Sequence, residues 1–364
     1  PKDLDFTCLK HAIKALITRH DALRLKFSFN EKVLTYQESM AMDSLCDNVS
    51  LPSLDPSTLK TAADSYHDQF HLQQTPLMKA VRFYSQNDAV LFINIHHLII
   101  DAVSWQILIE DLKHAFHSYK KTKASIDQTN APVLGPKTQS YQTWSQWINA
   151  KPCLTYFIEN EAEYWQKVVS TSNLNPSHFD HNVSCEIDNG HRNNTQITLS
   201  KTLTQALLKT ANKAYQTETL ELLLTSVYLG ISKLTQSHYL SFCIETHGRD
   251  GLTSFNSKLD KPVSLDISQT LGWFTSTYPF VVNLESKSIE SILCHIKETF
   301  RHVPNNGLGF GVLNWLQASP CDYDHKADIL FNYFGQTDQD QSKEESQDFN
   351  LIHIDTQDGA FQHM

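Results

Sequence analysis

The chain has 364 residues, of which 40% are hydrophobic and 19% charged, and its formal net charge is −10. This length exceeds what a single hydrophobic core usually covers, and the composition is typical of a folded globular protein, so we expect two domains or two related halves and exclude general disorder. The negative charge argues against a nucleic acid or an anionic membrane as partner, because phosphates are bound by clusters of lysine and arginine.

The first half is predicted to mix helices and strands. Apolar side chains at helical spacing, Leu9, Ile13 and Leu16, predict a helix that ends near residues 19–21, and residues 22–27 then alternate like a strand. The hydrophobic pattern continues with a predicted helix, two strands and an amphipathic helix, at residues 56–72, 78–84, 88–95 and around 108–116. A polar stretch with two prolines, residues 123–140, predicts a surface loop.

The first half ends with two predicted helices at residues 141–150 and 156–169, and the polar run 170–181 predicts a linker between the halves near residue 175. The second half repeats the mixture of helices and strands. Two further helices and a strand are predicted at residues 201–216, 218–235 and 238–245. The acid-rich residues 336–349 predict a solvated loop. We therefore expect a mixed α/β (α+β) fold with two domains, residues 1–175 and 176–364.

The cysteine pattern and the first residues of the chain indicate the cellular compartment of the protein. Seven cysteines without a CxxC pair indicate reduced thiols rather than a disulfide framework or a zinc site. No segment approaches the roughly 20 apolar residues of a membrane span, and the first residues lack the order of a secretory signal. We expect a cytoplasmic protein. Because Pro1 lies close to the first predicted helix, we also expect a longer polypeptide upstream.

Two adjacent histidines follow the apolar strand that ends at Ile95. Residues 96–105 are HHLIIDAVSW. His97 borders the turn and is a candidate general acid or base, because a neutral imidazole at a cavity wall is well suited to proton transfer. A metal site is disfavoured, since neighbouring strand residues point to opposite sides and no third spaced ligand follows. A structural role is the alternative, and we prefer it for His96 and Asp101.

A second polar group, ETHGRD at residues 245–250, follows the apolar strand 240–244. A carboxylate buried at a strand end has a raised pKa, which a base working near neutral pH needs. Glu245 is therefore a candidate base. An ion pair between Glu245 and Arg249 or another cation is the alternative, and for these residues taken alone we prefer it.

Two other motifs do not support their usual functions. Residues 306–311, NGLGFG, have GxGxG rather than GxGxxG spacing and follow no clear strand, so a tight backbone loop is predicted instead of a dinucleotide site. Ser104 lacks the GxSxG elbow of a hydrolase nucleophile.

Residues 96–105 resemble the HHxxxDxxSW signature of the epimerization domains of nonribosomal peptide synthetases, which are relatives of condensation domains and of chloramphenicol acetyltransferase. Four further passages agree in the same order. Residues 19–27 resemble RHxxLRxxF, residues 245–250 the EGHGRE box, residues 271–280 the GWFTxxYP box and residues 331–336 FNYLGQ. The resemblance covers nearly the whole chain. This sequence departs from it at Ala102 and Thr246, where glycine is usual, and at Asp250, where glutamate is usual.

The resemblance implies two acetyltransferase-like halves in a V around a central tunnel, with His97 of the first half opposite Glu245 of the second. It implies epimerization of the α-carbon of an aminoacyl or peptidyl thioester to a mixture of L and D forms. Inverting a stereocentre removes a hydrogen from one face and returns a proton to the other. His97 and Glu245 are the expected acid–base pair, with the abstracting member unassigned.

The remaining motif residues are expected to support this pair. The predicted supporting or substrate-binding residues are Asn332, Tyr333, Arg249, Tyr278 and Ser104. The predicted structural residues are His96, Asp101, Trp105 and Arg24, with Arg24 as the ion-pair partner of buried Asp101.

The resemblance implies no metal and no bound cofactor, because the phosphopantetheine arm is supplied by the carrier domain. The implied partners are an upstream peptidyl carrier domain and other synthetase domains. Two alternatives stay open: a condensation domain, in which a GxFVNTLP-like sequence would replace residues 273–279, and a non-catalytic synthetase module. The intact His97 and Glu245 argue against the latter.

Overall fold

The structure is a computed structural model that describes residues 4–31, 33–38, 40–66, 69–74, 76–86, 88–121, 134–174, 195–249, 265–285, 288–316, 327 and 329–335. The described residues form two compact units. The first unit comprises those up to residue 145 together with residues 265–274, and the second comprises residues 146–249 and those from 275 to 335. The predicted domain boundary at residue 175 lies outside the described residues. We call residues 265–274 the crossing segment, since they belong to the first unit although their neighbours in sequence belong to the second.

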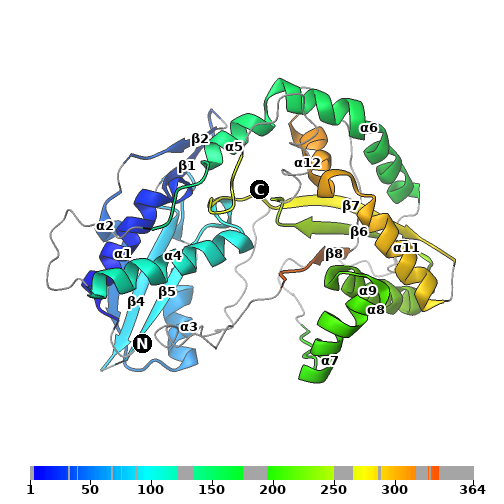
Figure 1. The fold of residues 1–364 in the computed structure, drawn as a ribbon. Coiled ribbons are helices and arrows are strands. Elements are labelled where there is room, and N and C mark those ends of the chain that lie inside the picture. Colours follow the sequence, from blue (N-terminus) through cyan, green and yellow to red (C-terminus); the bar gives the residue numbers. More distant parts are fainter. Residues whose placement is uncertain are drawn as a thin grey trace, which may run out of the picture. The chain divides into compact units, whose positions relative to one another are not determined.

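In its described residues, the first unit contains two small sheets accompanied by helices (Figure 1). Its elements are α1 (Phe6–Arg19), the 3₁₀ turn η1 (Asp21–Arg24), β1 (Leu25–Ser28), β2 (Val33–Tyr36), α2 (Met42–Leu45), β3 (Cys46–Ser50), α3 (Pro56–Asp64), β4 (Met78–Ser85), β5 (Asp88–Ile95), the 3₁₀ turn η3 (His97–Ile99), α4 (Ala102–Lys121) and the start of α5 (Tyr141–Ile148).

The core of the first unit forms on both faces of the sheet β3–β4–β5. β3 runs parallel to β4, and β4 runs antiparallel to β5. Because side chains alternate along a strand, Met78 and Ala80 join the apolar faces of α1 and α4, whereas Val81 and Phe83 pack with Leu59 of α3. Figure 1 shows α1 and α4 together beside β4 and β5. This packing fixes the end of β5, where the histidines stand.

The second unit has one described sheet with strand order β7–β6–β8. β7 is antiparallel and β8 parallel to the central β6. The other described elements of the unit are helices. The bounds are α6 (Lys151–Leu174), α7 (Lys201–Gln205), the π-helical η4 (Ala206–Ala211), α8 (Asn212–Tyr215), α9 (Thr219–Thr235), β6 (Tyr239–Thr246), β7 (Ser276–Asn283), α11 (Ile289–Arg301), η5 (Pro304–Gly307), α12 (Leu308–Trp315) and β8 (Ile329–Asn332).

An aromatic cluster joins the sheet of the second unit to α6 and α12. The ring of Trp165 lies 5.9 Å from that of Tyr278 on β7 and 5.3 Å from that of Phe310 on α12. The glycine-rich residues 306–311 permit this packing. A Cβ atom on Gly307 would lie 1.9 Å from the Tyr278 ring, and one on Gly309 would lie 1.9 Å from the Glu161 carboxylate. The predicted tight loop is thus right at Gly307, whose φ is +82°, but the chain is helical from Leu308 onward.

Most predicted elements are confirmed, and each exception has an identifiable contact as its cause. The strands at 78–84, 88–95 and 238–245 are present as β4, β5 and β6. The strand predicted from residue 22 begins only at Leu25, because Arg24 turns back to donate to the Ile17 carbonyl at 2.5 Å and closes η1.

Two predicted helix ends were wrong. The helix predicted to residue 72 ends at Asp64, and Tyr66 folds onto the sheet, where its hydroxyl donates to Asp47 at 3.1 Å. The linker predicted from residue 170 is helical to Leu174, because α6 continues through Ser172, which is buried and bonded to Ser241 at 2.8 Å. The rest of that linker, the loop at 336–349 and residues 122–133 lie outside the described part of the chain.

Candidate active site

The two histidines at the end of β5 have different surroundings. His96 is half-buried and caps η3, where its Nδ1 accepts a hydrogen bond from the Leu98 N–H at 3.1 Å. Burial, aided by the neighbouring His97, holds the pKa of His96 below its usual value. His97 is exposed at the first position of η3. An exposed imidazole on a fixed turn is free to meet a substrate, whereas His96 is engaged with its own backbone.

Asp101 is 2% exposed and accepts hydrogen bonds from two backbone amides. Its Oδ1 accepts from the Ser104 N–H at 2.7 Å, which caps α4, and its Oδ2 accepts from the Phe274 N–H at 3.1 Å. The predicted ion pair with Arg24 is corrected: Arg24 donates to Asp21 at 2.7 Å. The sequence analysis did not predict the hydrogen bond from the distant Phe274 N–H. This bond compensates the buried carboxylate of Asp101 for lost contact with water.

Ser104 is completely buried, and its hydroxyl exchanges two hydrogen bonds with one residue of the crossing segment. Ser104 Oγ donates to the Gly272 carbonyl at 3.0 Å and accepts from the Gly272 N–H at 3.1 Å. The predicted role in substrate binding is therefore corrected, because no part of this side chain is accessible. Trp105, the next motif residue, is half-buried and packs on the core of the first unit.

Trp273 of the crossing segment forms a wall beside His97. The imidazole and indole centroids lie 5.5 Å apart with the planes inclined at 64°, and Trp273 is 42% exposed. Tyr141 donates from its hydroxyl to the Trp273 carbonyl at 3.1 Å. Burial, together with the nearby Asp101 carboxylate, raises the pKa of Tyr141 to about 12, so its hydroxyl stays protonated as a donor.

Glu245 is placed at the end of β6 in the second unit. It pairs in register with Thr277 of β7 and Asn332 of β8, and Asn332 Nδ2 donates to Glu245 Oε1. Phe242 and Ile244 fill the core side of β6, so strand alternation places Glu245 on the opposite side. On that side Thr277 and Leu330 are exposed. The carboxylate is thus half-buried, oriented by an amide and next to accessible surface.

Of the other predicted supporting residues of the second unit, one lies in the core and two are half-buried. Tyr278 points to the core side, is 1% exposed, and burial raises the pKa of its hydroxyl far above the usual value. Its predicted role in binding substrate is corrected, because it packs against Trp165 and Gly307. Arg249 is half-buried, and its backbone N–H donates to His247 Nδ1 at 3.2 Å. Tyr333 is half-buried directly after β8.

The site residues therefore form two groups. His97, Trp273, Asp101 and Ser104 come together in the first unit, although Ser104 and Gly272 are 168 positions apart in sequence. Glu245 and Asn332 come together in the second unit. The predicted acid–base pair takes one member from each unit and stays a prediction.

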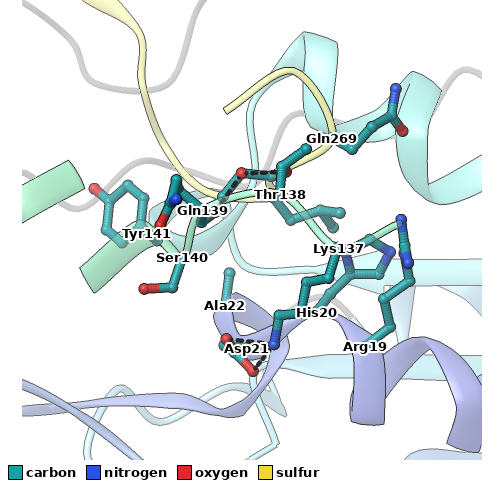
Figure 2. Close-up of a pocket in the computed structure, with 12 residues that line it drawn as sticks. Arg19, His20, Asp21, Ala22, Lys137, Thr138, Gln139, Ser140, Tyr141 and Gln269 are labelled. Atoms are coloured by element: carbon teal, nitrogen blue, oxygen red, sulfur yellow. Dashed lines mark hydrogen bonds and ion pairs between the residues drawn. The ribbon is translucent and has the colours of Figure 1, made fainter. Parts of the chain in front are cut away.

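A polar pocket lies elsewhere in the first unit, between the end of α1, residues 137–141 and the crossing segment (Figure 2). Figure 2 shows Lys137 reaching Asp21, from which its Nζ lies 2.9 Å away. Arg19 and His20 both bond to Asp111, at 2.9 and 2.8 Å. These polar and charged side chains are paired with one another. Their contacts hold residues 134–140 against the residues that follow α1.

Neither a metal cluster nor a membrane helix is found in the described part of the chain. Among the described residues, no three histidine, cysteine, aspartate or glutamate side chains are grouped so that they could share a metal ion. No helix in the described ranges combines the length and hydrophobicity that a membrane crossing requires.

Comparison with known proteins relates this architecture to peptide synthases. The sequence profile of the condensation domain family matches residues 1–363. The chain is 32% identical to bacitracin synthase 2 of Bacillus licheniformis over 350 residues, which cover 93% of this chain and 12% of that protein. It is 29% identical to gramicidin S synthase 1 of Brevibacillus brevis over 360 residues, which cover 94% of this chain and 30% of that protein. The chain thus spans less than a third of either relative.

Solved structures share the fold. The epimerization domain from the third module of tyrocidine synthetase B superposes with a TM-score of 0.70 at 23% identity, covering 92% of this chain and 74% of that one. The condensation enzyme VibH superposes with a TM-score of 0.58 at 16% identity, covering 84% of this chain and 66% of that one. The predicted mixed α/β fold is confirmed by these likenesses.

Proposed function

Because this chain belongs to the condensation domain family, we propose that it epimerizes the α-carbon of an aminoacyl or peptidyl thioester carried by a carrier domain of a nonribosomal peptide synthetase. The family fold is shared by a domain named for epimerization and an enzyme named for condensation. The choice between the two reactions rests on the side chains of the candidate site, not on the fold.

The observation that carries the proposal is the carboxylate at the end of β6. Glu245 stands on the accessible side of its sheet and is oriented by the Asn332 amide. Epimerization requires two acid–base groups, one for each face of the planar intermediate, whereas amide formation between two bound substrates requires no second group on the far face. Glu245 is the second group, and His97 is the first.

The chemistry needs acidification of the α-hydrogen and stabilisation of the intermediate. A thioester acidifies its α-hydrogen more than an ester or amide does, and one member of the pair removes that hydrogen. The other member returns a proton to the opposite face. Negative charge develops on the thioester carbonyl oxygen when the hydrogen is removed and is lost when the proton is returned, and a hydrogen-bond donor at that oxygen stabilises the intermediate. Tyr333 and the second N–H of the Asn332 amide are the donors that we assign to this oxygen.

The proposal is tested with a carrier domain loaded with an L-aminoacyl thioester in deuterated water. Deuterium incorporation at the α-carbon and formation of the D-aminoacyl thioester are the expected results, and the product is a mixture because the two forms have similar free energies. Absence of both with folded protein contradicts the proposal. An amide product formed when a second, acceptor-loaded carrier is added would identify a condensation domain instead.

Glu245→Gln provides the matching variant. It removes the charge but keeps an oxygen that can accept from Asn332. Glu163→Gln is the control, because Glu163 is an exposed carboxylate on α6 of the same unit. We expect exchange to be lost in Glu245→Gln and retained in Glu163→Gln.

A further inference from the structure

Residues 96–105, which we call the double-histidine passage, contain two polar residues that bind the backbone of the crossing segment, Asp101 and Ser104. Asp101 accepts from the Phe274 N–H, and Ser104 both donates to and accepts from Gly272. Trp273 lies between these two anchored residues. The passage that carries His97 therefore also holds, by three hydrogen bonds, the backbone from which the neighbouring indole projects.

The hydrogen bonds of Ser104 are made in a fully buried place. Its relative exposure is 0% and that of Asp101 is 2%. Removing one partner of a buried hydrogen bond leaves the other unsatisfied, which costs more than the bond is worth on the surface. Loss of the Ser104 hydroxyl would leave both the N–H and the carbonyl of Gly272 without this partner.

Tyr141 also contacts this part of the crossing segment. Its hydroxyl donates to the Trp273 carbonyl, and its ring covers Gly272 so closely that a Cβ there would lie 2.3 Å from a ring carbon. Its ring also meets Phe274 edge to face at 5.2 Å. Three successive backbone units, 272, 273 and 274, are thus held by side chains of α4 and α5 or of the turn before α4.

We infer that Ser104 is a positioning residue: together with Asp101 and Tyr141, it fixes the backbone of residues 272–274 so that the exposed indole of Trp273 forms a substrate-contacting wall beside His97. This inference rests on the proposed epimerase function for its activity readout only. Trp273 is the member that touches substrate, since it is 42% exposed and its ring is next to the exposed imidazole.

Asp101 and Ser104 are linked to each other as well as to residues 272–274. Asp101 Oδ1 caps α4 at the Ser104 N–H, which orients the serine toward Gly272. His97 is the first residue of η3, four positions before Asp101. Because η3 and the first turn of α4 share one backbone, the imidazole and the anchors of the indole move together. A shift of about 1 Å at a reacting group is enough to lower a rate about 100-fold.

The test uses Ser104→Ala, with Ser65→Ala as the matched control. Ser65 is an exposed serine in the same unit, and its hydroxyl donates to the Ala62 carbonyl of its own turn. The protein, with its six tryptophans labelled as 5-fluorotryptophan, gives fluorine resonances, and Trp273→Phe identifies the one from Trp273. The α-exchange rate of a carrier-bound aminoacyl thioester is measured on the same samples.

We expect Ser104→Ala to shift or broaden the Trp273 resonance, to leave the Trp165 resonance of the second unit unchanged, and to lower the α-exchange rate roughly tenfold. Ser65→Ala should change none of these. Ser104→Cys should lie between wild type and alanine, because a thiol donates and accepts only weakly. Trp273→Phe, which keeps an aromatic wall, should retain more activity than Trp273→Ala.

An unchanged Trp273 resonance in folded Ser104→Ala would overturn the inference, and so would a shifted resonance with an unchanged exchange rate in an active enzyme. If Ser104→Ala fails to fold, Tyr141→Phe replaces it, since this variant removes the hydroxyl bonded to Trp273 but keeps the ring over Gly272. If the wild-type protein shows no α-exchange, the proposed function fails, while the fluorine resonances still decide whether Ser104 positions Trp273.

Discussion

The imidazole of His97 and the indole of Trp273 lie 5.5 Å apart, centroid to centroid, in an inclined edge arrangement. The histidine follows β5 in the first half of the sequence, and the tryptophan shortly precedes β7 in the second half. Their contact joins the double-histidine passage and the GWFT passage into one site within the first unit. It also brings the residue that we propose for proton transfer beside an accessible aromatic surface.

The acid–base pair leads to a distinct result for each member. His97→Ala and Glu245→Ala should each lower formation of the D-product by at least about 100-fold, the usual range for removal of a general acid or base. Exchange of the α-hydrogen without inversion in His97→Ala, but none in Glu245→Ala, would assign Glu245 as the abstracting base. The measurement is mass spectrometry of the released amino acid combined with chiral separation. Full D-product formation in either variant would contradict the pairing.

Asn332 should matter because it orients the Glu245 carboxylate. Asn332→Ala removes the amide that donates to Glu245 Oε1, and we expect a roughly tenfold slower α-exchange, which corresponds to the loss of one partly buried hydrogen bond to a charged group. Asn160→Ala is the control, since Asn160 is exposed on α6 and donates to a carbonyl of its own helix. Equal rates for the two variants would remove Asn332 from the site.

Gly272 should not tolerate a methyl group. A Cβ there would lie 2.3 Å from the Tyr141 ring, so Gly272→Ala should destabilise the protein by about 1–3 kcal/mol, as overpacking does. Gly135→Ala, in the same unit, meets nothing within 4 Å and serves as control. Urea unfolding of both variants measures the difference. If both unfold at the same urea concentration, the close packing of Tyr141 on Gly272 is disproved.

Lowering the pH should reduce the free energy of unfolding in two steps, which come from His20 and Asp111 near the end of α1. Burial lowers the pKa of His20 below its ordinary 6.5, against the opposing Asp111 and with Arg19 and Lys137 contributing to the lowering. The unfolded chain then binds this proton more readily, so the stability is present above about pH 6.5 and is lost as the pH falls below it, at no more than about 1.4 kcal/mol per pH unit.

The second step comes from Asp111. Burial alone would raise its pKa, but the hydrogen bond and charge of His20 and the charge of Arg19 outweigh burial and leave the pKa below 3.8. Its stabilising effect is present above that value and is lost below it. In His20→Gln the first step should disappear and the second should become smaller, because only Arg19 then lowers the pKa of Asp111; thermal unfolding from pH 7.5 to 3 measures both. An unchanged slope between pH 7 and 5.5 would show that His20 is not its source.

The local elements followed from the sequence because their causes are local. The apolar spacing of Leu9, Ile13 and Leu16 produces α1, and the alternation at 78–84 and 88–95 produces β4 and β5. The end of β5 also located His97, since polar residues directly after an apolar strand mark its boundary. The helix end at Asp64 was missed because Tyr66 is drawn onto the sheet by Asp47, a contact outside its own segment.

The sequence by itself determined the family, the positions of most strands and helices, and His97 and Glu245 as the residues to test. Only the tertiary structure decided that Asp101 holds the Phe274 amide rather than Arg24, that Ser104 is bonded to Gly272, and that Tyr278 belongs to the core. The reason is physical. Periodicity reports which face of an element is buried, whereas the partner of a buried polar group is chosen by folding, here across 168 positions of chain.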